Sequence, residues 1–215
     1  MALLHKNQSE IPQDAVRLDE KQAVIYFMKL VDGWPDKWDI WPLAYTPGIL
    51  GATTVMSSIY INSHYRGKLR LGTFGRLSSY IPTVVLPALM TTFFHRAFIV
   101  PDVVLARQQC PVCVQTRAGL LQAAFSTVYP MLLAPMSAFM FATRHFTYRL
   151  PSITEQPREV LKLYKKLSNP IMLTVTGLLA FNMMVSMFLT GKEFETVYKV
   201  NLKLQEQEQE EVVDL

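Results

Sequence analysis

The sequence predicts an all-α integral membrane protein, a four-helix bundle with short amphipathic flanking helices. Four long stretches contain no Asp, Glu, Lys or Arg, and charged segments separate them. Half of the residues are hydrophobic and 18% are charged, against roughly 25% in an ordinary soluble domain. A helix needs about 20 apolar residues to cross a bilayer, so each stretch is long enough to span it. The charge-free stretches are residues 40–65, 77–95, 118–143 and 167–191.

A tryptophan cluster precedes the first span. Trp34, Trp38 and Trp41 are the only tryptophans in the chain, and indole settles at the headgroup level of a membrane. The cluster therefore predicts an interfacial anchor, with a small soluble tryptophan cluster as the alternative. Because Pro35 and Pro42 interrupt backbone hydrogen bonding, we expect a bent lead-in here rather than the start of the helix.

Residues 1–41 are predicted to form an N-terminal amphipathic and interfacial segment. Within it, residues 14–31 have the composition of a helix, with Asp14 placed to cap it and Gly33 placed to end it. Apolar residues are dense in the second half of this helix. It therefore suits a membrane surface or a partner protein.

The predicted bundle covers residues 42–191. Its second span is the shortest and contains Pro82 and Pro87, which transmembrane helices tolerate where neighbours satisfy the freed carbonyls; a re-entrant segment is the alternative. The third span contains Pro130 and Pro135, so a kink is expected. The four spans are expected over about residues 42–64, 77–95, 118–143 and 168–190.

Small and polar residues mark contact faces on the spans. Ala134, Ala138 and Ala142 recur every four residues, which places them on one face and allows close helix approach in lipid. They predict a helix-packing face, whose commonest use is packing within the bundle. Asn182 gives the fourth span a polar contact among methionines.

The fourth span has clear boundaries in the sequence. It follows Ser168-Asn169-Pro170, a helix-entry signal, and Gly191 is expected to end it. Residues 192–215 predict an acidic helical tail, which either solubilises the chain end or docks a partner.

Lys and Arg are distributed unequally between the loops. Residues 66–76 and 144–166 together carry ten, and residues 96–117 carry three. Loops rich in Lys and Arg stay on the cytoplasmic side, or on the matrix side in a mitochondrion. We therefore expect the first two loops there, and both termini and the loop 96–117 on the opposite side. The net charge of +4 is too small to indicate nucleic-acid binding.

Residues 155–167 predict a basic amphipathic helix. Such a helix suits an anionic membrane surface, such as a cardiolipin-rich leaflet, and a merely solvated connection is the alternative. The residues expected to contact lipid headgroups are Arg158, Lys162, Lys165 and Lys166, and those expected on the apolar face are Val160, Leu161, Tyr164 and Leu167.

Cys110-Pro-Val-Cys113 is the motif with intrinsic chemistry. A C-x-x-C pair can form a small disulfide, exchange disulfides with a partner or supply half of a zinc site. The histidines are scattered and there is no second C-x-x-C, so we expect no metal. A thioredoxin-type enzyme needs a βαβ context, which this pattern lacks. The predicted orientation places both thiols outside the reducing compartment, which favours a structural disulfide or inert thiols over catalytic exchange.

Other catalytic patterns are absent from the sequence. It contains no nucleophile elbow, no phosphate-binding glycine loop and no H-E-x-x-H motif. The predicted spans contain no acidic residue, which argues against a proton relay or a cation-coupled carrier. We therefore expect a protein without enzymatic activity or cofactor, whose helix faces bind other proteins.

A longer pattern begins at the cysteine pair. The C-x-x-C is followed by T-R, a small residue and G-L, and then by a Y-P pair and a further proline. The residues of this pattern are Cys110, Cys113, Thr116, Arg117, Ala118, Gly119, Leu120, Tyr129, Pro130 and Pro135. It resembles the transmembrane protein 126 family of the mitochondrial inner membrane. The resemblance covers roughly residues 45–190 and leaves the N-terminal 44 residues and the acidic tail unmatched.

The resemblance implies an assembly factor, acting as a scaffold or chaperone, for the membrane arm of respiratory complex I. The implied partners are complex I membrane-arm subunits and the mitochondrial complex I assembly complex, with its acyl-CoA dehydrogenase-like, intermediate-associated and adaptor proteins. In the inner membrane that the resemblance implies, the Lys and Arg distribution places both termini and the loop 96–117 in the intermembrane space and the loops 66–76 and 144–166 in the matrix. The resemblance supplies no catalytic residues. A membrane thiol oxidoreductase using the C-x-x-C pair is the alternative, and a small-solute carrier is a weaker one.

Overall fold

The computed structural model of the chain describes residues 18–105, 110–148 and 156–213. Its regular structure within these residues is helical, with no strand, which confirms the predicted all-α class. The helices are α1 (Glu20–Asp32), α2 (Lys37–Lys68), α3 (Arg76–Tyr80), α4 (Leu86–Phe94), α5 (Val100–Val104), α6 (Pro111–Ala123), α7 (Tyr129–His145), α8 (Pro157–Ser168) and α9 (Met172–Val213). The π-helical segments η2 (Ile81–Val85), η3 (His95–Ile99) and η4 (Ala124–Val128) join α3 to α4, α4 to α5 and α6 to α7, and the 3-10 segment η5 (Asn169–Ile171) joins α8 to α9.

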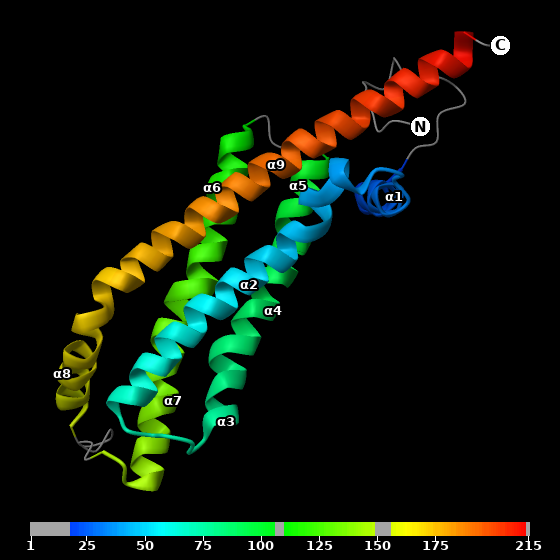
Figure 1. The fold of residues 1–215 in the computed structure, drawn as a ribbon. Coiled ribbons are helices and arrows are strands. Elements are labelled where there is room, and N and C mark those ends of the chain that lie inside the picture. Colours follow the sequence, from blue (N-terminus) through cyan, green and yellow to red (C-terminus); the bar gives the residue numbers. More distant parts are fainter. Residues whose placement is uncertain (1–17, 106–109, 149–155, 214–215) are drawn as a thin grey trace.

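The long helices form an elongated bundle and alternate in direction (Figure 1). α2 runs from the end that holds α1 to the end that holds α8, the run from α3 to α5 returns, the run of α6 and α7 descends, and α9 returns. We name these the α1 end and the α8 end. Residues 66–76 lie at the α8 end, and α5 lies at the α1 end beside the start of α6. The basic connections therefore share one end, as their charge pattern predicts, and the side of the membrane that this end faces stays a prediction.

Three helical runs are long and apolar enough to cross a membrane in the part of the chain that the structure describes. They are Arg76–Val104, Pro111–His145 and Pro157–Gln207. α2 has 32 residues but does not reach the same mean hydropathy, so the predicted count of four spans is not established. The reason lies in its enclosed face, which is polar: Thr46, Thr54, Ser57, Ser58 and Asn62 are all buried.

The outer surface of the bundle is apolar. Leu173 is 88% exposed, Met56 72% and Met136 69%, and further exposed large apolar side chains lie on every long helix. Soluble monomers rarely expose contiguous apolar surface on this scale. Contact with lipid instead of water removes the free-energy cost of exposing these side chains, so the surface fits a membrane protein.

Two apolar clusters fill the bundle, one at each end. The α1-end cluster is formed by α1, α2, η3, α5, α6 and α9, and the α8-end cluster by α2, α7, α8, α9 and the residues around them. The α1-end cluster contains Phe27, Val31, Ile40, Leu43, Ile99, Val100, Val103, Val104, Val114, Ala118, Val197, Val200 and Leu204. The α8-end cluster contains Ile61, Tyr65, Leu69, Leu71, Met131, Ala134, Ala138, Phe139, Phe141, Ala142, Leu167, Ile171 and Val175.

Widened helical turns accommodate three of the prolines. η2, η3 and η4 each end two residues before a proline, namely Pro87, Pro101 and Pro130. A proline ring clashes with the carbonyl four residues earlier and removes a backbone donor, and a π turn relieves this by widening the helix locally. The second predicted span therefore lies in one continuous helical run rather than a re-entrant loop.

The first helix begins later than the sequence predicted. α1 starts at Glu20, and Asp19 and Gln22 form a capping box in which the Asp19 backbone N–H donates to Gln22 Oε1 at 3.3 Å. The predicted cap, Asp14, lies outside the described residues. The capping box satisfies two orphan backbone donors, which explains why the helix starts here.

The expected bent lead-in before the first span is helical from Lys37 onwards. Asp36 caps α2 by accepting a hydrogen bond from the backbone N–H of Trp38 at 3.0 Å. Pro42 and Pro47 lie inside α2 and are buried, so packing against neighbouring helices outweighs the lost backbone hydrogen bonds.

α9 passes through Gly191 and continues to Val213, whereas the sequence predicted a helix end at the glycine. Glu195 binds Lys192 and Lys199 at 2.7 Å each, and ion pairs one turn apart support an exposed helix. The apolar residues of the same segment pack into the α1-end cluster. These two contributions outweigh the low helix propensity of one glycine.

Arg66 closes the connection between α2 and α3. Its Nη2 donates to the carbonyls of Gly72 and Phe74 at 2.9 Å each, and its Nη1 donates to the carbonyl of Gly75 at 3.3 Å. The φ angles of Gly72 and Gly75 are +52° and +57°, a region that favours glycine. A Cβ atom at Gly75 would also lie 2.6 Å from the ring of Phe141.

Gly75→Ala is expected to destabilise the protein more than Gly72→Ala. Both alanines would adopt a left-handed conformation, at a cost of about 1–2 kcal/mol. The Gly75 variant also clashes with Phe141, whereas no atom of another described residue beyond the chain neighbours lies within 4 Å of a Cβ at Gly72. Overpacking adds about 1–3 kcal/mol. Thermal unfolding of the purified variants in detergent measures the difference, and equal midpoints would contradict it.

Candidate functional site

A seam of hydrogen-bonded polar side chains crosses the bundle between the two apolar clusters. Gln122 Nε2 in α6 lies 3.1 Å from the hydroxyl oxygens of Thr53 and Thr54 in α2, and 3.2 Å from Asn182 Oδ1 in α9. The Thr54 hydroxyl lies 3.2 Å from that of Thr91 in α4. The seam therefore ties together α2, α4, α6 and α9.

Asn182 anchors α9 in the polar seam. Its Nδ2 donates to Ser57 Oγ and to the carbonyl of Leu178, both at 2.8 Å, and the residue is fully buried. The sequence predicted a polar contact from Asn182 but did not identify its partner Gln122. The signal for Gln122 is its position as a lone amide in a charge-free stretch, because amides inside membranes hydrogen-bond across helices.

A buried histidine–carboxylate pair lies near the seam. His95 Nε2 in η3 donates to Glu193 in α9, 3.0 Å from Oε1 and 3.1 Å from Oε2, and the two side chains are 3% and 0% exposed. Sequence analysis missed this pair because Glu193 lies two residues beyond the expected end of the fourth span. Burial without a partner would be costly for either group, so the pair links η3 to α9.

A small cavity borders both the seam and the buried pair. It has a volume of about 10 Å³, and its lining includes Thr91, His95 and Gln122. Gln122 Oε1 is buried and has no hydrogen-bond partner within the described residues. A space of this size and polarity has room for about one water molecule.

The cysteine pair lies at the exposed start of α6, at the α1 end. Cys110 is the N-cap residue, and the backbone N–H of Cys113 donates to its carbonyl at 3.1 Å. Both thiols are free and exposed, and Cys113 Sγ donates to Cys110 Sγ at 2.6 Å. This hydrogen bond holds the pKa of the Cys110 thiol below its ordinary value. The two sulfurs are thus within reach of each other and of a partner protein.

Arg117 of the family pattern fixes α6 against the end of the preceding helical run. Its Nη2 lies 2.5 Å from Asp102 Oδ2 and donates to the carbonyl of Phe98 at 2.7 Å. Asp102 is 8% exposed at its side chain, so the ion pair is partly withdrawn from solvent. In the part of the chain that the structure describes, the Thr116 hydroxyl bonds within its own helix, to the carbonyl of Val112 at 2.9 Å.

Several other residues of the family pattern have packing roles. A Cβ atom at Gly119 would lie 2.9 Å from Met187 Cγ and 3.0 Å from Met183 Cγ, so the glycine permits close contact between α6 and α9. Tyr129 is half-buried, and Pro130 and Pro135 are buried in α7. The predicted packing face is also internal: Ala134, Ala138 and Ala142 are fully buried in the α8-end cluster.

The predicted membrane-surface residues lie away from the seam, at the two ends of the bundle. Trp34 packs against the α1-end cluster, Trp41 is half-buried and Trp38 is 84% exposed. The predicted headgroup-binding residues Arg158, Lys162, Lys165 and Lys166 are exposed on α8. The structure therefore brings the two cysteines together but does not gather the predicted residues into one site.

The apolar exterior and the hydrogen-bonded seam define the class of this molecule, an α-helical membrane protein. Among the described residues there is no group of three or more side chains that could hold a metal ion. The family model of Transmembrane protein 126 matches residues 36–208, and the chain belongs to this family. The match extends beyond the resemblance over residues 45–190 and includes Trp38, Trp41 and the first part of the tail.

Curated relatives agree with the family match. The chain is 45% identical over 207 residues to Transmembrane protein 126 of Drosophila melanogaster, covering 96% of this chain and 93% of the relative. It is 25% identical over 129 residues to Transmembrane protein 126A of Rattus norvegicus, covering 60% and 63% of the two chains. It is 24% identical over 150 residues to Transmembrane protein 126A of Pongo abelii, covering 70% and 74%. No solved structure matches the chain.

The hydrogen bond between Gln122 and Asn182 is expected to stabilise the bundle. A double-mutant cycle with Gln122→Ala and Asn182→Ala should give a coupling energy of about 0.6–1.7 kcal/mol, the range of polar contacts in membrane bundles. Unfolding in detergent and denaturant measures it. Thr176→Ala is the control, because among the described residues that hydroxyl bonds only to the carbonyl of Met172 in its own helix. If the effects of the two single variants on the free energy of unfolding are additive, the result would contradict a direct contact.

Cys113→Ala is expected to move the alkylation of Cys110 to higher pH. The hydrogen bond from Cys113 is the largest cause of the lowered pKa of Cys110, so its removal raises that pKa and leaves less thiolate at neutral pH. Iodoacetamide labelling of the reduced protein across a pH series measures the shift. An unchanged profile would show that the thiol of Cys113 does not tune its neighbour.

Proposed function

We propose that this chain is a non-enzymatic assembly factor of the mitochondrial inner membrane that helps to build the membrane arm of respiratory complex I. It acts as a scaffold within the mitochondrial complex I assembly complex. It holds newly inserted subunits and shields their lipid-facing surfaces until their neighbours arrive. α2 also crosses the membrane, which gives four spans; both termini lie in the intermembrane space, and the α8 end faces the matrix.

The observation that carries the proposal is the open flank of α9. In the candidate span that contains α9, only 22% of the most apolar stretch is buried inside the protein, against 39% and 50% in the other two candidate spans. Phe181, Met184 and Phe188 are 52%, 63% and 63% exposed, and their spacing of three and four residues places them on one face. Aromatic and methionine side chains are enriched in protein interfaces, and methionine adapts to irregular partners.

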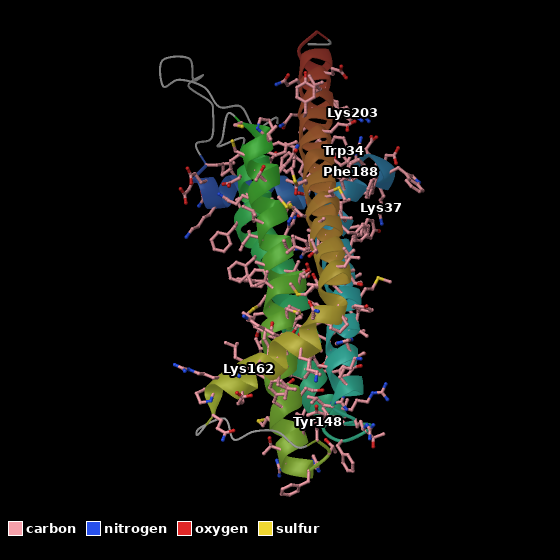
Figure 2. The ribbon with its side chains drawn as sticks, turned by 90° about the vertical axis from the view of Figure 1, so that its left-hand side faces the viewer. Trp34, Lys37, Tyr148, Lys162, Phe188 and Lys203 are labelled. Carbon is pink, nitrogen blue, oxygen red and sulfur yellow. The ribbon has the colours of Figure 1, made fainter. Side chains whose placement is uncertain are left out.

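Family membership is the second support. The chain belongs to the transmembrane protein 126 family, and the resemblance to that family implies complex I assembly. Phe188 lies towards the α1 end, at the level of Trp34 and Lys37 (Figure 2). The α9 flank therefore offers a partner helix a surface that begins near one membrane interface and continues into the bilayer.

A second candidate function is disulfide exchange with a partner protein. The exposed cysteine pair at the start of α6 supports it, because the two thiols are in contact and the pKa of Cys110 is lowered. The double variant Cys110→Ser and Cys113→Ser separates the two candidates. If this double variant fully rescues a strain that lacks the protein, disulfide exchange is excluded and the scaffold function is left as the candidate.

Purification of the tagged full chain from mitochondria in mild detergent tests the scaffold. Mass spectrometry should recover complex I membrane-arm subunits together with other assembly proteins. The triple variant Phe181→Ala, Met184→Ala and Phe188→Ala should lose the membrane-arm subunits, because it removes the interface side chains of α9.

A matched variant on another exposed face controls for general loss of apolar surface. Leu86→Ala, Leu89→Ala and Phe93→Ala remove side chains of α4 that are 38%, 63% and 64% exposed, and the partners should remain bound. Recovery of no complex I subunit with the unaltered chain would overturn the proposal. Normal abundance and size of complex I in cells that lack the protein would overturn it as well.

A further inference from the structure

The elbow between α8 and α9 forms an open pocket at the α8 end of the bundle. α8 lies across the bundle and carries Lys162 on its outer side (Figure 2), and η5 makes the bend into α9. The pocket has a volume of about 490 Å³. Its lining residues are Tyr164, Lys165, Lys166, Ser168, Asn169 and Met172.

Contacts from α2 hold the elbow in place. The hydroxyl of Tyr65 lies 2.7 Å from Ser168 Oγ, and His64 Nε2 donates to the carbonyl of Leu167 at 3.0 Å. The rings of Tyr65 and Tyr164 stack with centroids 6.4 Å apart. The pocket is therefore built on a buried, hydrogen-bonded base rather than on a free helix.

The surroundings of the pocket are strongly basic. In residues 66–76, 144–148 and 156–166 there are nine Lys and Arg residues and one acid, Glu159. That acid is bound to Lys162 at 2.7 Å. Lys165 and Lys166 have no carboxylate within ion-pair distance in the described part of the chain, so their charges are available to an anion.

The pocket lies where the polar part of the chain meets the apolar part. The charge-free stretch begins at Leu167, directly after Lys166, which places the two lysines at headgroup depth if α9 crosses the bilayer. On the apolar side, Met172 is 48% and Leu173 88% exposed. On α8, Leu161 is 56% exposed, whereas Val160, Leu163 and Tyr164 pack inward, although the sequence pattern grouped Leu161 with Val160 and Tyr164 on one apolar face.

We propose that the elbow pocket binds one anionic phospholipid, with its phosphate beside Lys165 and Lys166 and its acyl chains against Met172 and Leu173. Cationic charge at the interface attracts anionic headgroups, and the adjoining apolar side chains favour a lipid over a free anion. Arg158 and Lys162 lie outside the pocket lining, so the structure separates them from the two lysines with which the sequence grouped them. The site does not depend on the complex I role.

Titration of the purified full chain with phosphatidylglycerol in a neutral detergent tests the site. The thermal unfolding midpoint should rise with the anionic lipid and rise less with phosphatidylcholine. The double variant Lys165→Gln and Lys166→Gln should weaken the apparent affinity for phosphatidylglycerol about 30-fold, since each lysine near a membrane surface contributes about fivefold. Its unfolding midpoint without added lipid shows whether the variant is folded.

The control variant removes the same charge at the opposite end of the bundle. Lys192→Gln and Lys199→Gln should change the lipid affinity by less than about twofold, because these lysines bind Glu195 far from the elbow. An equal loss in the control would show diffuse charge attraction and overturn the site. An equal shift of the unfolding midpoint with inorganic phosphate would show that the site binds free anions and would overturn the proposal that its ligand is a lipid. Unchanged affinity for phosphatidylglycerol in a folded variant that carries Lys165→Gln and Lys166→Gln would overturn the site itself.

Discussion

The amide side chains of Gln122 and Asn182 must find hydrogen-bond partners inside the bundle, because hydrocarbon supplies none. Their contacts with Thr53, Thr54 and Ser57 fix the positions of α6 and α9 along the axis of α2. Sliding α9 by one helical turn, about 5.4 Å, would break them. The apolar clusters above and below the seam are non-directional and would tolerate such a slide far better. The polar seam therefore determines the register of the bundle.

The same constraint explains why the polar side chains of α2 lie on its buried face. α2 packs against the α3–α5 run, α7 and α9, and its buried hydroxyl and amide groups face these neighbours rather than lipid. The outer face of α2 is apolar instead, and Met56 on it is 72% exposed. His95 and Glu193 follow the same rule at the α1 end, where each is the partner that makes burial of the other tolerable.

Sequence patterns predicted the parts of the fold that depend on local composition. The charge-free stretches lie within the long helices, the basic amphipathic helix is present as α8, and Gly119 of the family pattern lies at a close helix contact. The helix end expected at Gly191 was wrong because its neighbours in space, not its propensity, decide whether α9 continues. The seam and the His95–Glu193 pair join residues 37 to 125 positions apart in the chain, and no local pattern identifies such partners.

The π turn η4 divides the contacts of one helical run between two sets of neighbouring helices. Each π turn holds one residue more than the α turn it replaces, and one residue rotates a helix face by about 100°. Before η4 the run packs mainly against α9, where Gly119 permits close contact, and beyond η4 it packs against α2 and carries Ala134 into the α8-end cluster. The run from Pro111 to His145 is thus continuous in its backbone but divided in its contacts. It behaves as two helices sharing one axis, each with its own set of neighbours.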